Sequence, residues 1–499
     1  MSIPESPRER RAWLLEKLPT QVDLRPLING DRPDIPGSSQ IPLRDVYQDE
    51  VVGSLPAADA ATVDQAVESA RDAFDKSDWR FIHPRARARY LYCIAEEIER
   101  RLDVITLYES FNVGKPISGV RAWDVPNAAE VFRYYAGWAD KIHGTALPDF
   151  GGATITVTKE PVGVCAAIMP WNFPFADLAW KVAPALAAGC TVVVKSAERA
   201  PLSAQILADI AQSCGLPPGV LNIIAGTGEE AGSYLASHRG IDKISFTGST
   251  ETATRVVEGS SNHLPRIGLE LGGKSPNVIL ADADLDAAAA GAIGAMFSVS
   301  GQDCGAGSRL LVDEAVRDEF VTKLLANVER RVIGDPLENS TQQGPLIDEK
   351  HIRRVEDYVA QAQMDGGRLL CGGGRLDGER SQCFAPTVLE GVSAESPAWI
   401  EEIFGPVGIV RSFSGLDEAI GLANDTKFGL AGGVWTASTA SAERFVRELR
   451  VGTVWVNCYG WFDTTSPWGG RGASGFGKEL GFEGLEEYLL TKSTFRVGR

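Results

Sequence analysis

The sequence offers little for binding metals or crossing membranes. Its 499 residues include eight cysteines and five histidines, with no C-x-x-C pair and no zinc-type spacing. No apolar run reaches the ~18 residues that a membrane-spanning helix requires. The longest candidate, residues 287–299, is rich in alanine and glycine and predicts a buried helix. We therefore expect neither a metal site nor a membrane span.

Positive charge is scarce as well. The chain has 66 acidic and 49 basic residues and a formal net charge of −17, which repels nucleic acid phosphates and anionic lipids. Arg8, Arg10 and Arg11 are followed by Glu16 and Lys17 rather than by an apolar segment, so no secretory signal is indicated. We expect a cytoplasmic protein that binds neither nucleic acid nor membrane.

Most of the cysteines have the sequence context of small buried hydrophobic residues. Cys165 lies in GVCAAIMP and Cys190 directly precedes TVVVK, and both stretches are apolar. At this length and in a reducing compartment we expect no disulfide framework. Cys304 differs, because it lies in the glycine-rich segment GQDCGAGS, where flanking glycines let backbone and substrate approach the sulfur.

The chain is too long for one core, and its periodicity indicates at least two α/β units. The N-terminal part has helical spacing over residues 61–74, 86–110 and 131–142. Between residues 163 and 272 apolar runs alternate with helical stretches, which predicts a parallel, doubly wound sheet. Ligands bind at the carboxyl ends of the strands of such sheets. A second α/β unit follows, and residues 154–157 alternate like a half-exposed ribbon strand.

The usual dinucleotide fingerprint is absent. Its nearest equivalent, Gly226, Gly228 and Gly232, is spaced G-x-G-x-x-x-G and is also typical of a tight turn. In FTGST, residues 246–250, a strand ends at a glycine followed by Ser249. That serine can simply cap the next helix, and the helix N-terminus also suits a pyrophosphate.

Two further groups of residues, a pair and a set of three, have alternative interpretations. Lys195 and Glu198 follow an apolar strand and are placed to bind ribose hydroxyls, where a carboxylate favours NAD by repelling a 2′-phosphate. A surface ion pair is the alternative. Cys304, Glu270 and Asn172 have the chemistry of a nucleophile, a general base and an oxyanion donor, although each alone is also a common structural residue.

Seven motifs together resemble the aldehyde dehydrogenase superfamily, from about residue 27 to residue 493. They are MPWNFP (169–174), KSAE (195–198), FTGST (246–250), ELGGKSP (270–276), GQDCGAGSR (301–309), EEIFGPV (401–407) and PWGG…SGFGKELGFEG (467–484). The resemblance implies NAD-dependent oxidation of an aldehyde to a carboxylic acid through a thioester. One departure is Ser196, where the family often has proline after the lysine.

The resemblance also assigns roles to individual residues. Cys304 is similar to the nucleophile, Asn172 to the oxyanion donor that works with the Cys304 backbone N–H, and Glu270 to the base. Glu479 is similar to a second carboxylate that relays protons. Glu402 is similar to the residue that holds the nicotinamide ribose, and Phe404 to the one beside the nicotinamide. The implied cofactor contacts are Ile168, Trp171, Lys195, Glu198, Gly228, Phe246, Ser249, Leu271, Glu402 and Phe404.

The implied α/β fold has three parts. We expect an NAD-binding domain at residues 1–141 and 162–267, built on a doubly wound parallel sheet. A catalytic α/β domain is expected at residues 268–470. A small oligomerisation ribbon and tail at residues 142–161 and 484–499 would join a homodimer or homotetramer.

The substrate is predicted from polar and aromatic residues of the implied tunnel. Asn127 and Asp177 stand where the family commonly has apolar residues, and Asp303 directly precedes the nucleophile. The candidate aromatic walls are Trp171, Trp180, Trp461 and Phe462. Acids beside aromatic rings suit a cation, which favours an aminoaldehyde or a betaine-type aldehyde. An ordinary tunnel, or one for a hydroxylated aldehyde, is the alternative.

Two other functions fit the same motifs. One is an acylating dehydrogenase that passes the acyl group to coenzyme A, whose relatives tend to lack the base. The other is a catalytically retired member that serves as a binding or structural protein. The presence of both Cys304 and Glu270 favours the hydrolytic enzyme over either alternative.

Overall fold

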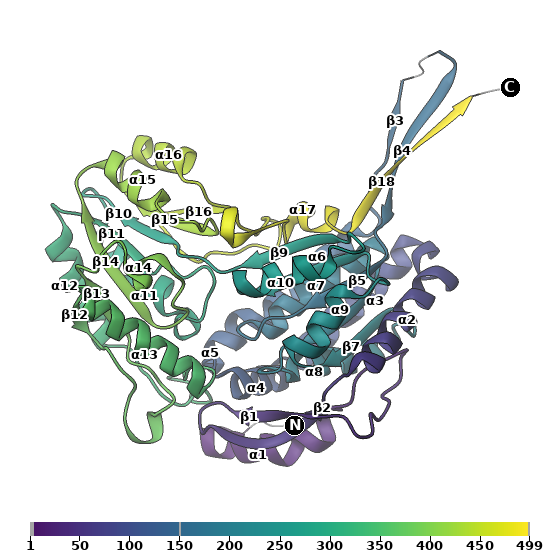
Figure 1. The fold of residues 1–499 in the computed structure, drawn as a ribbon, viewed down its shortest axis with the longest axis horizontal. Coiled ribbons are helices and arrows are strands. Elements are labelled where there is room, and N and C mark those ends of the chain that lie inside the picture. The colour runs from purple at the N-terminus through teal and green to yellow at the C-terminus, as the bar shows by residue number, and fades with distance from the viewer. Residues whose placement is uncertain (1–3, 149–150, 498–499) are drawn as a thin grey trace.

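Two α/β units and a projecting ribbon make up the molecule (Figure 1). The computed structural model describes residues 4–148 and 151–497. Residues 1–3 of the predicted NAD-binding domain, and residues 149–150 and 498–499 of the predicted ribbon and tail, lie outside the described residues. The predicted α/β fold with a doubly wound parallel sheet is confirmed.

The first unit is built on a six-stranded sheet in the order β17-β9-β8-β5-β6-β7, parallel except for β17 at one edge. Every residue of β5, β6 and β7 is buried, which explains their continuous apolar character. The strands are β5 (Val164–Ile168), β6 (Thr191–Ser196), β7 (Leu221–Ala225), β8 (Lys243–Gly248), β9 (Arg266–Leu271) and β17 (Gly475–Phe476). The helices between them are α7 (Pro174–Ala188), α8 (Leu202–Ser213), α9 (Ser233–Ser237) and α10 (Thr250–Ser260).

The N-terminal segment packs helices and a hairpin against this sheet. It comprises α1 (Pro7–Gln21), β1 (Gln40–Asp45), β2 (Glu50–Pro56), α2 (Ala60–Lys76), α3 (Pro84–Arg100), α4 (Leu102–Val113), α5 (Ile117–Gly119) and α6 (Val125–Trp138). The helical spacing at residues 61–74 is confirmed by α2. The single helix expected at residues 86–110 is two helices that meet at Arg101, and the helix expected at 131–142 begins earlier, as α6.

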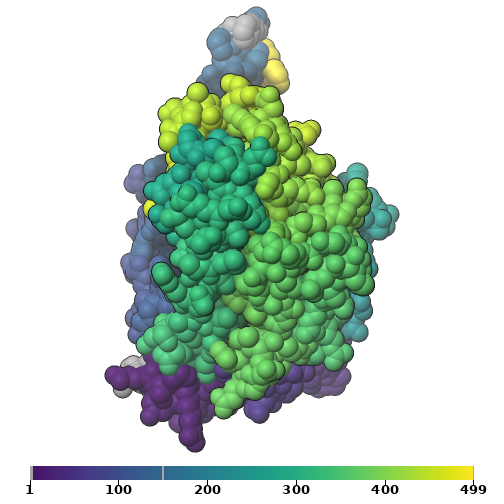
Figure 2. Space-filling view, turned by 90° about the vertical axis from the view of Figure 1, so that its left-hand side faces the viewer, coloured from purple at the N-terminus to yellow at the C-terminus, as the bar shows by residue number. Residues whose placement is uncertain are grey.

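The second unit holds a seven-stranded sheet in the order β12-β13-β14-β11-β10-β15-β16, with only β12 antiparallel (Figure 2 shows this unit from outside). Its strands are β10 (Pro276–Ile279), β11 (Arg309–Asp313), β12 (Arg368–Cys371), β13 (Thr387–Glu390), β14 (Val407–Phe413), β15 (Ala431–Trp435) and β16 (Thr453–Val456). Its helices are α11 (Leu285–Phe297), α12 (Arg317–Glu329), α13 (Glu349–Met364), α14 (Pro397–Ile400), α15 (Leu416–Asn424) and α16 (Thr439–Glu448). Helix α17 (Gly481–Glu486) then leads into the ribbon.

The boundary expected between residues 267 and 268 falls inside β9. That strand pairs with β8 from Arg266 to Leu271, so Glu270 belongs to the first sheet. The antiparallel strand β17 adds to the same edge, with Gly475 opposite Glu270. Residues from the C-terminal part of the chain therefore complete the first unit.

The ribbon is a three-stranded antiparallel sheet in the order β18-β4-β3. Its strands are β3 (Thr145–Leu147), β4 (Ala153–Pro161) and β18 (Leu489–Val497). It extends away from the body of the molecule and carries the C-terminal strand (Figure 1). The half-exposed strand expected at residues 154–157 lies within β4, whose side chains are partly exposed along its length.

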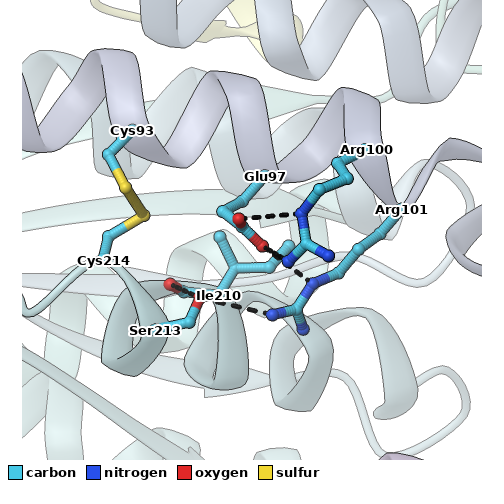
Figure 3. The surroundings of a disulfide bond; sticks show 7 residues. All are labelled: Cys93, Glu97, Arg100, Arg101, Ile210, Ser213 and Cys214. Carbon is cyan, nitrogen blue, oxygen red and sulfur yellow. Dashed lines mark hydrogen bonds and ion pairs between the residues drawn. A yellow bond between two sulfur atoms is a disulfide. The ribbon is translucent and has the colours of Figure 1, made fainter.

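One disulfide corrects the expectation that the chain has none. Cys93 on α3 is bonded to Cys214, which follows α8, with 5.8 Å between their Cα atoms (Figure 3). A few residues along α3, Glu97 forms an ion pair with Arg101 at 3.1 Å. The two cysteines are 121 residues apart. No local spacing could signal the bond, because the pair meets only where α3 packs against α8.

Candidate active site

A cavity of about 1710 Å³ opens between the two units, at the carboxyl ends of β5, β6, β8 and β9. Parallel strands end at the same edge of a sheet, so the segments that follow them converge there. The second unit closes the cavity with the loop after α11, the start of α13 and the segment before β14.

Cys304 reaches the cavity from the loop after α11. Two residues shortly before it, Val299 and Ser300, have left-handed backbone angles, with φ of 47° and 59°. This conformation is costly for the β-branched side chain of Val299. A Cβ on Gly273 would lie 2.6 Å from the Cys304 carbonyl oxygen, so a glycine lets the two loops meet. Burial raises the pKa of the Cys304 thiol well above its ordinary value, and Asp303 raises it further.

Asn172 lies between β5 and α7, buried beside the nucleophile loop. Its Nδ2 donates a hydrogen bond to the carbonyl of Gln302 at 3.0 Å. An amide nitrogen carries two hydrogens, so a second donor is free for a ligand at Cys304. The contact fixes the amide two residues from that cysteine.

Glu270 is the last residue but one of β9, with only 6% of its surface exposed. Among the described residues its Oε2 atom has no hydrogen-bonding partner. Burial raises the pKa of Glu270 well above its ordinary value, and the charge of Glu479 adds to the shift. Glu479 is held by an ion pair with buried Lys181 and accepts a hydrogen bond from Ser245 at 3.3 Å. The carboxyls of Glu270 and Glu479 thus lie in one buried polar cluster with Lys181 and Ser245.

The opposite end of the cavity has the features of a dinucleotide site. Lys195 and Glu198 form an ion pair at 3.2 Å at the end of β6. Burial opposes ionisation of Glu198, but the charge of Lys195 prevails and lowers its pKa. Ser249 caps α10 by accepting from the Thr252 N–H at 3.2 Å, so its hydroxyl serves the helix while the N-terminus lines the cavity.

All ten predicted cofactor contacts line this one cavity: Ile168, Trp171, Lys195, Glu198, Gly228, Phe246, Ser249, Leu271, Glu402 and Phe404. Glu402 accepts a hydrogen bond from the Gly273 N–H at 3.0 Å. A Cβ on Gly272 would lie 2.1 Å from a Glu402 oxygen, so only glycine leaves room for it. At Gly228 none of the atoms compared lies within 4 Å of the position that a Cβ would take. An acid–lysine pair at a strand end, a helix N-terminus that faces the cavity and glycines beside Glu402 suit NAD.

The predicted substrate residues are only partly brought together. The cavity is lined by Asp177, Trp180, Asp303 and Phe462, but not by Asn127 or Trp461. The side chain of Trp461 is directed to solvent and 77% exposed. Asn127 instead accepts a hydrogen bond from the Trp180 indole N–H at 2.8 Å, which orients that ring. Asp303 accepts a hydrogen bond from the Gly305 N–H at 2.9 Å, so its carboxylate stabilises the backbone of the Cys304 loop.

Several lining residues were not singled out in the sequence. These are Lys115, Trp123, Asp124, Trp455, Tyr459 and Trp468. Trp468 lies in the PWGG motif and was therefore within reach of sequence reasoning. The others carry no local signal, because they reach the cavity from the loop after α4, the turns before α6, β16 and the segment after β16 only through packing. No group of three or more residues suited to a metal ion occurs among those the structure describes.

Comparison with known proteins matches the aldehyde dehydrogenase family model to residues 35–494. Human retinal dehydrogenase 2 is 44% identical over 446 residues, covering 89% of this chain and 86% of the relative. The chain belongs to the aldehyde dehydrogenase family. An indole-3-acetaldehyde dehydrogenase from P. syringae, solved with NAD⁺, has a TM-score of 0.95 and 36% identity, covering 98% of this chain and 99% of that one.

A betaine aldehyde dehydrogenase from Staphylococcus aureus, also solved with NAD⁺, superposes with a TM-score of 0.94. It is 34% identical and covers 96% of each chain. The present aldehyde dehydrogenase is thus an NAD-dependent oxidoreductase acting on an aldehyde. None of the helices among its described residues is long and apolar enough to cross a membrane.

Proposed function

We propose that this aldehyde dehydrogenase converts its aldehyde to a carboxylic acid through a thioester on Cys304. The supporting observation is that Cys304, Asn172 and Glu270, from three separate segments, line the same cavity as the dinucleotide-type site. A nucleophile, an oxyanion donor and a base within one cavity are the parts that acyl transfer needs.

Each residue then has a defined step. The Cys304 thiol releases its proton to solvent and the sulfur attacks the aldehyde carbon, and the resulting oxyanion accepts hydrogen bonds from Asn172 Nδ2 and the Cys304 backbone N–H. Bound NAD would accept the hydride that leaves this carbon as the thioester forms, and its positive charge would favour the thiolate. Glu270 takes a proton from water, whose oxygen adds to the thioester carbon and releases the acid and the free thiol.

Replacing the nucleophile tests this mechanism. Cys304→Ala should abolish NADH formation while NAD binding, followed by calorimetry, stays largely intact. Cys458→Ala is the matched control, since Cys458 is a half-buried free cysteine that does not line the cavity. Substantial turnover by Cys304→Ala would refute the proposal.

The two alternative functions predict different products. An acylating enzyme would form an acyl-coenzyme A from aldehyde, NAD and coenzyme A, and a retired member would form no NADH with any aldehyde. The buried Glu270 carboxyl beside the nucleophile favours hydrolysis. Analysis of the products with and without coenzyme A separates the three cases.

We propose a cationic aldehyde as the substrate, because Asp177 faces the cavity without a hydrogen-bonding partner among the described residues. Burial raises the pKa of Asp177 to about 8, although Lys181 opposes the shift. Lys181 is itself engaged by Glu479 and by Thr247 at 2.6 Å. A buried carboxylate with no close cation costs free energy that a cationic ligand would offset.

Aromatic rings surround the same end of the cavity. Trp123 lies 5.6 Å from Phe173, 6.5 Å from Trp180 and 5.8 Å from Phe462 between ring centroids. Phe462 lies 4.8 Å from Trp468. A quaternary or primary ammonium group is attracted to such ring faces. The betaine aldehyde dehydrogenase among the structural neighbours fits this interpretation.

The decisive comparison uses betaine aldehyde and its neutral isostere, 3,3-dimethylbutyraldehyde. Wild type should favour the cation in kcat/KM, and Asp177→Leu should lose that preference. The ratio of kcat/KM for betaine aldehyde to kcat/KM for the neutral aldehyde should rise with pH through about 8. The reason is that Asp177 is neutral below its raised pKa and attracts a cation only when it is ionised above that pKa. Asp72→Leu is the control, since Asp72 is an exposed residue of α2 that pairs with Lys76 and does not line the cavity. Preference for the neutral aldehyde, or an unchanged ratio in Asp177→Leu, would contradict the assignment.

We also propose that the ribbon joins a homodimer or homotetramer. Leu147, Ile155 and Phe495 lie directly opposite one another across its three strands and form one apolar row. Leu147 and Phe495 are 42% and 67% exposed in the single chain. Exposed apolar rows on a projecting sheet are typical of subunit contacts.

We propose a cytoplasmic location for the protein. Six of the eight cysteines are free thiols, the state that a reducing compartment maintains. Cytoplasmic reductants would open the Cys93–Cys214 bond. Fractionation combined with thiol trapping tests this, and recovery of the oxidised protein from a membrane-enclosed compartment would contradict it.

A further inference from the structure

An ion pair joins Arg199, which lines the cofactor cavity, to Asp348, which lies just before the lining residues Lys350 and His351. Arg199 directly follows Glu198 in the loop after β6, and Asp348 precedes α13 in the second unit. Arg199 Nε and Asp348 Oδ2 are 3.0 Å apart, and their side chains are 32% and 25% exposed. The pair therefore connects the ribose-binding loop of one unit to a helix start of the other.

A cluster of rings continues this connection toward the reacting end of the cavity. The Arg199 guanidinium lies 5.8 Å from the centre of the Trp171 ring. Trp171 meets His351 at 5.7 Å and Phe404 at 5.4 Å, both edge to face. His351 lies on the first turn of α13, so one helix start carries both the ion pair and the ring contact.

The cluster also fixes an unfavourable backbone conformation. Phe404 has a φ of 60°, in the left-handed region that non-glycine residues avoid. The His351 Nε2 hydrogen is donated to the Phe404 carbonyl at 2.7 Å. Burial lowers the pKa of His351 to about 4, so the ring is neutral and makes this contact near pH 7. Phe404 is two residues from Glu402, so the start of α13 determines how this segment lines the cavity.

We propose that Arg199 and Asp348 are positioning residues that form a clasp across the cofactor cavity. The clasp holds the start of α13, and through His351 the Phe404 segment, against the bound dinucleotide, and it thereby slows cofactor release. The inference rests on NAD occupying this cavity. It assigns no chemical step to Arg199 or Asp348.

A simpler hypothesis gives Arg199 only a direct attraction to the cofactor phosphates. The two hypotheses differ in the effect of Asp348 on cofactor binding. In the clasp, Arg199 and Asp348 act together, so loss of either frees the cofactor. In the direct attraction, Asp348 opposes binding by its negative charge, and its neutralisation tightens the complex.

The experiment measures the dissociation rate of NADH by stopped-flow fluorescence in full-length enzyme. Arg199→Gln and Asp348→Asn remove one charge each. Asparagine retains the capping of α13, where Asp348 accepts the His351 N–H at 2.8 Å. Each variant should release NADH about two- to five-fold faster, the range that a partly exposed ion pair supports. The double variant should be no faster than the singles, because the interaction is lost once.

Three comparisons separate the clasp from other effects. Arg353→Gln is the matched control, since Arg353 pairs with Glu349 at 2.8 Å on the exposed side of α13 and does not line the cavity. Single-turnover formation of NADH should be unchanged in Arg353→Gln. Added salt should speed release from wild type but not from the double variant.

The outcomes are exclusive. Faster release in both single variants with no further gain in the double variant supports the clasp. Slower release from Asp348→Asn, additive effects or unchanged rates would overturn it. Loss of NADH binding in Cys304→Ala would instead count against the proposed function, because that variant leaves the clasp intact.

Discussion

Burial controls the charge of the reacting residues in this enzyme. The pKa of Cys304 and that of Glu270 are both raised by desolvation, and the pKa of Glu402 is raised to about 7. Each group therefore holds its proton at a higher pH than it would in water. Since the proposed mechanism needs a thiolate and a carboxylate base, turnover should increase with pH until both are ionised.

Glu270→Gln tests the base at the residue scale. We expect a burst of NADH followed by a phase slowed by about 10²–10⁴-fold, the usual contribution of a general base. Hydride transfer should be affected less, because it precedes the attack of water. Rapid-mixing absorbance at 340 nm separates the two phases. If both steps slowed equally, the base would be another residue, with Glu479 the next candidate.

Cofactor choice is a second property of single residues. Glu198 is ionised beside Lys195 and should oppose a 2′-phosphate by about 1–3 kcal/mol. Wild type should therefore favour NAD over NADP in kcat/KM, and Glu198→Gln should narrow the gap. Glu251→Gln is the control, because Glu251 pairs with Arg255 on α10 and does not line the cavity. Comparable kcat/KM for both cofactors in wild type would rule out this role.

At the scale of elements, the disulfide joins two helices that the chain separates widely. Cys93 on α3 and Cys214 after α8 close a segment of 121 residues. A cross-link over such a distance restricts the unfolded chain and stabilises the folded protein by typically 2–4 kcal/mol. Both sulfurs belong to half-buried residues, so small reductants can reach the bond.

Cys93→Ala with Cys214→Ala should lower the melting temperature by about 3 °C, the stabilisation divided by the unfolding entropy of a chain this long. Calorimetry of the wild type with and without reductant should give the same difference. The double alanine variant is the control, since a reductant should leave it unchanged. Free thiols at both positions in oxidised wild type, shown by mass spectrometry, would contradict the bond.

At the scale of the whole molecule, the ribbon carries a row of apolar side chains that the single chain leaves exposed. Phe495→Asp places a charge at the β18 end of the apolar row and should dissociate the proposed oligomer. Light scattering after size exclusion measures the mass directly. Arg496→Asp is the control, because successive residues of a strand point to opposite faces. A monomeric wild type, or an oligomer unchanged by Phe495→Asp, would refute the assignment.

The order of elements and the motifs at strand ends could be predicted from the sequence because both are local. Continuous apolar runs predict buried parallel strands, and β5, β6 and β7 have them. The choice of Cys304 and Glu270 followed from residue chemistry beside glycines, and that of Asn172 from an amide side chain at a strand end, together with the family resemblance. Alternation within β4 similarly indicated the ribbon.

Only the tertiary structure decided which segments far apart in the chain contact one another. Cys93 meets Cys214, Arg199 meets Asp348, and Asn127 bonds Trp180 while Trp461 is directed to solvent. Local periodicity specifies which face of an element is buried, but not which distant element covers it. That choice depends on how the helices and sheets pack as a whole, because a side chain's partners are set by the neighbouring elements around it.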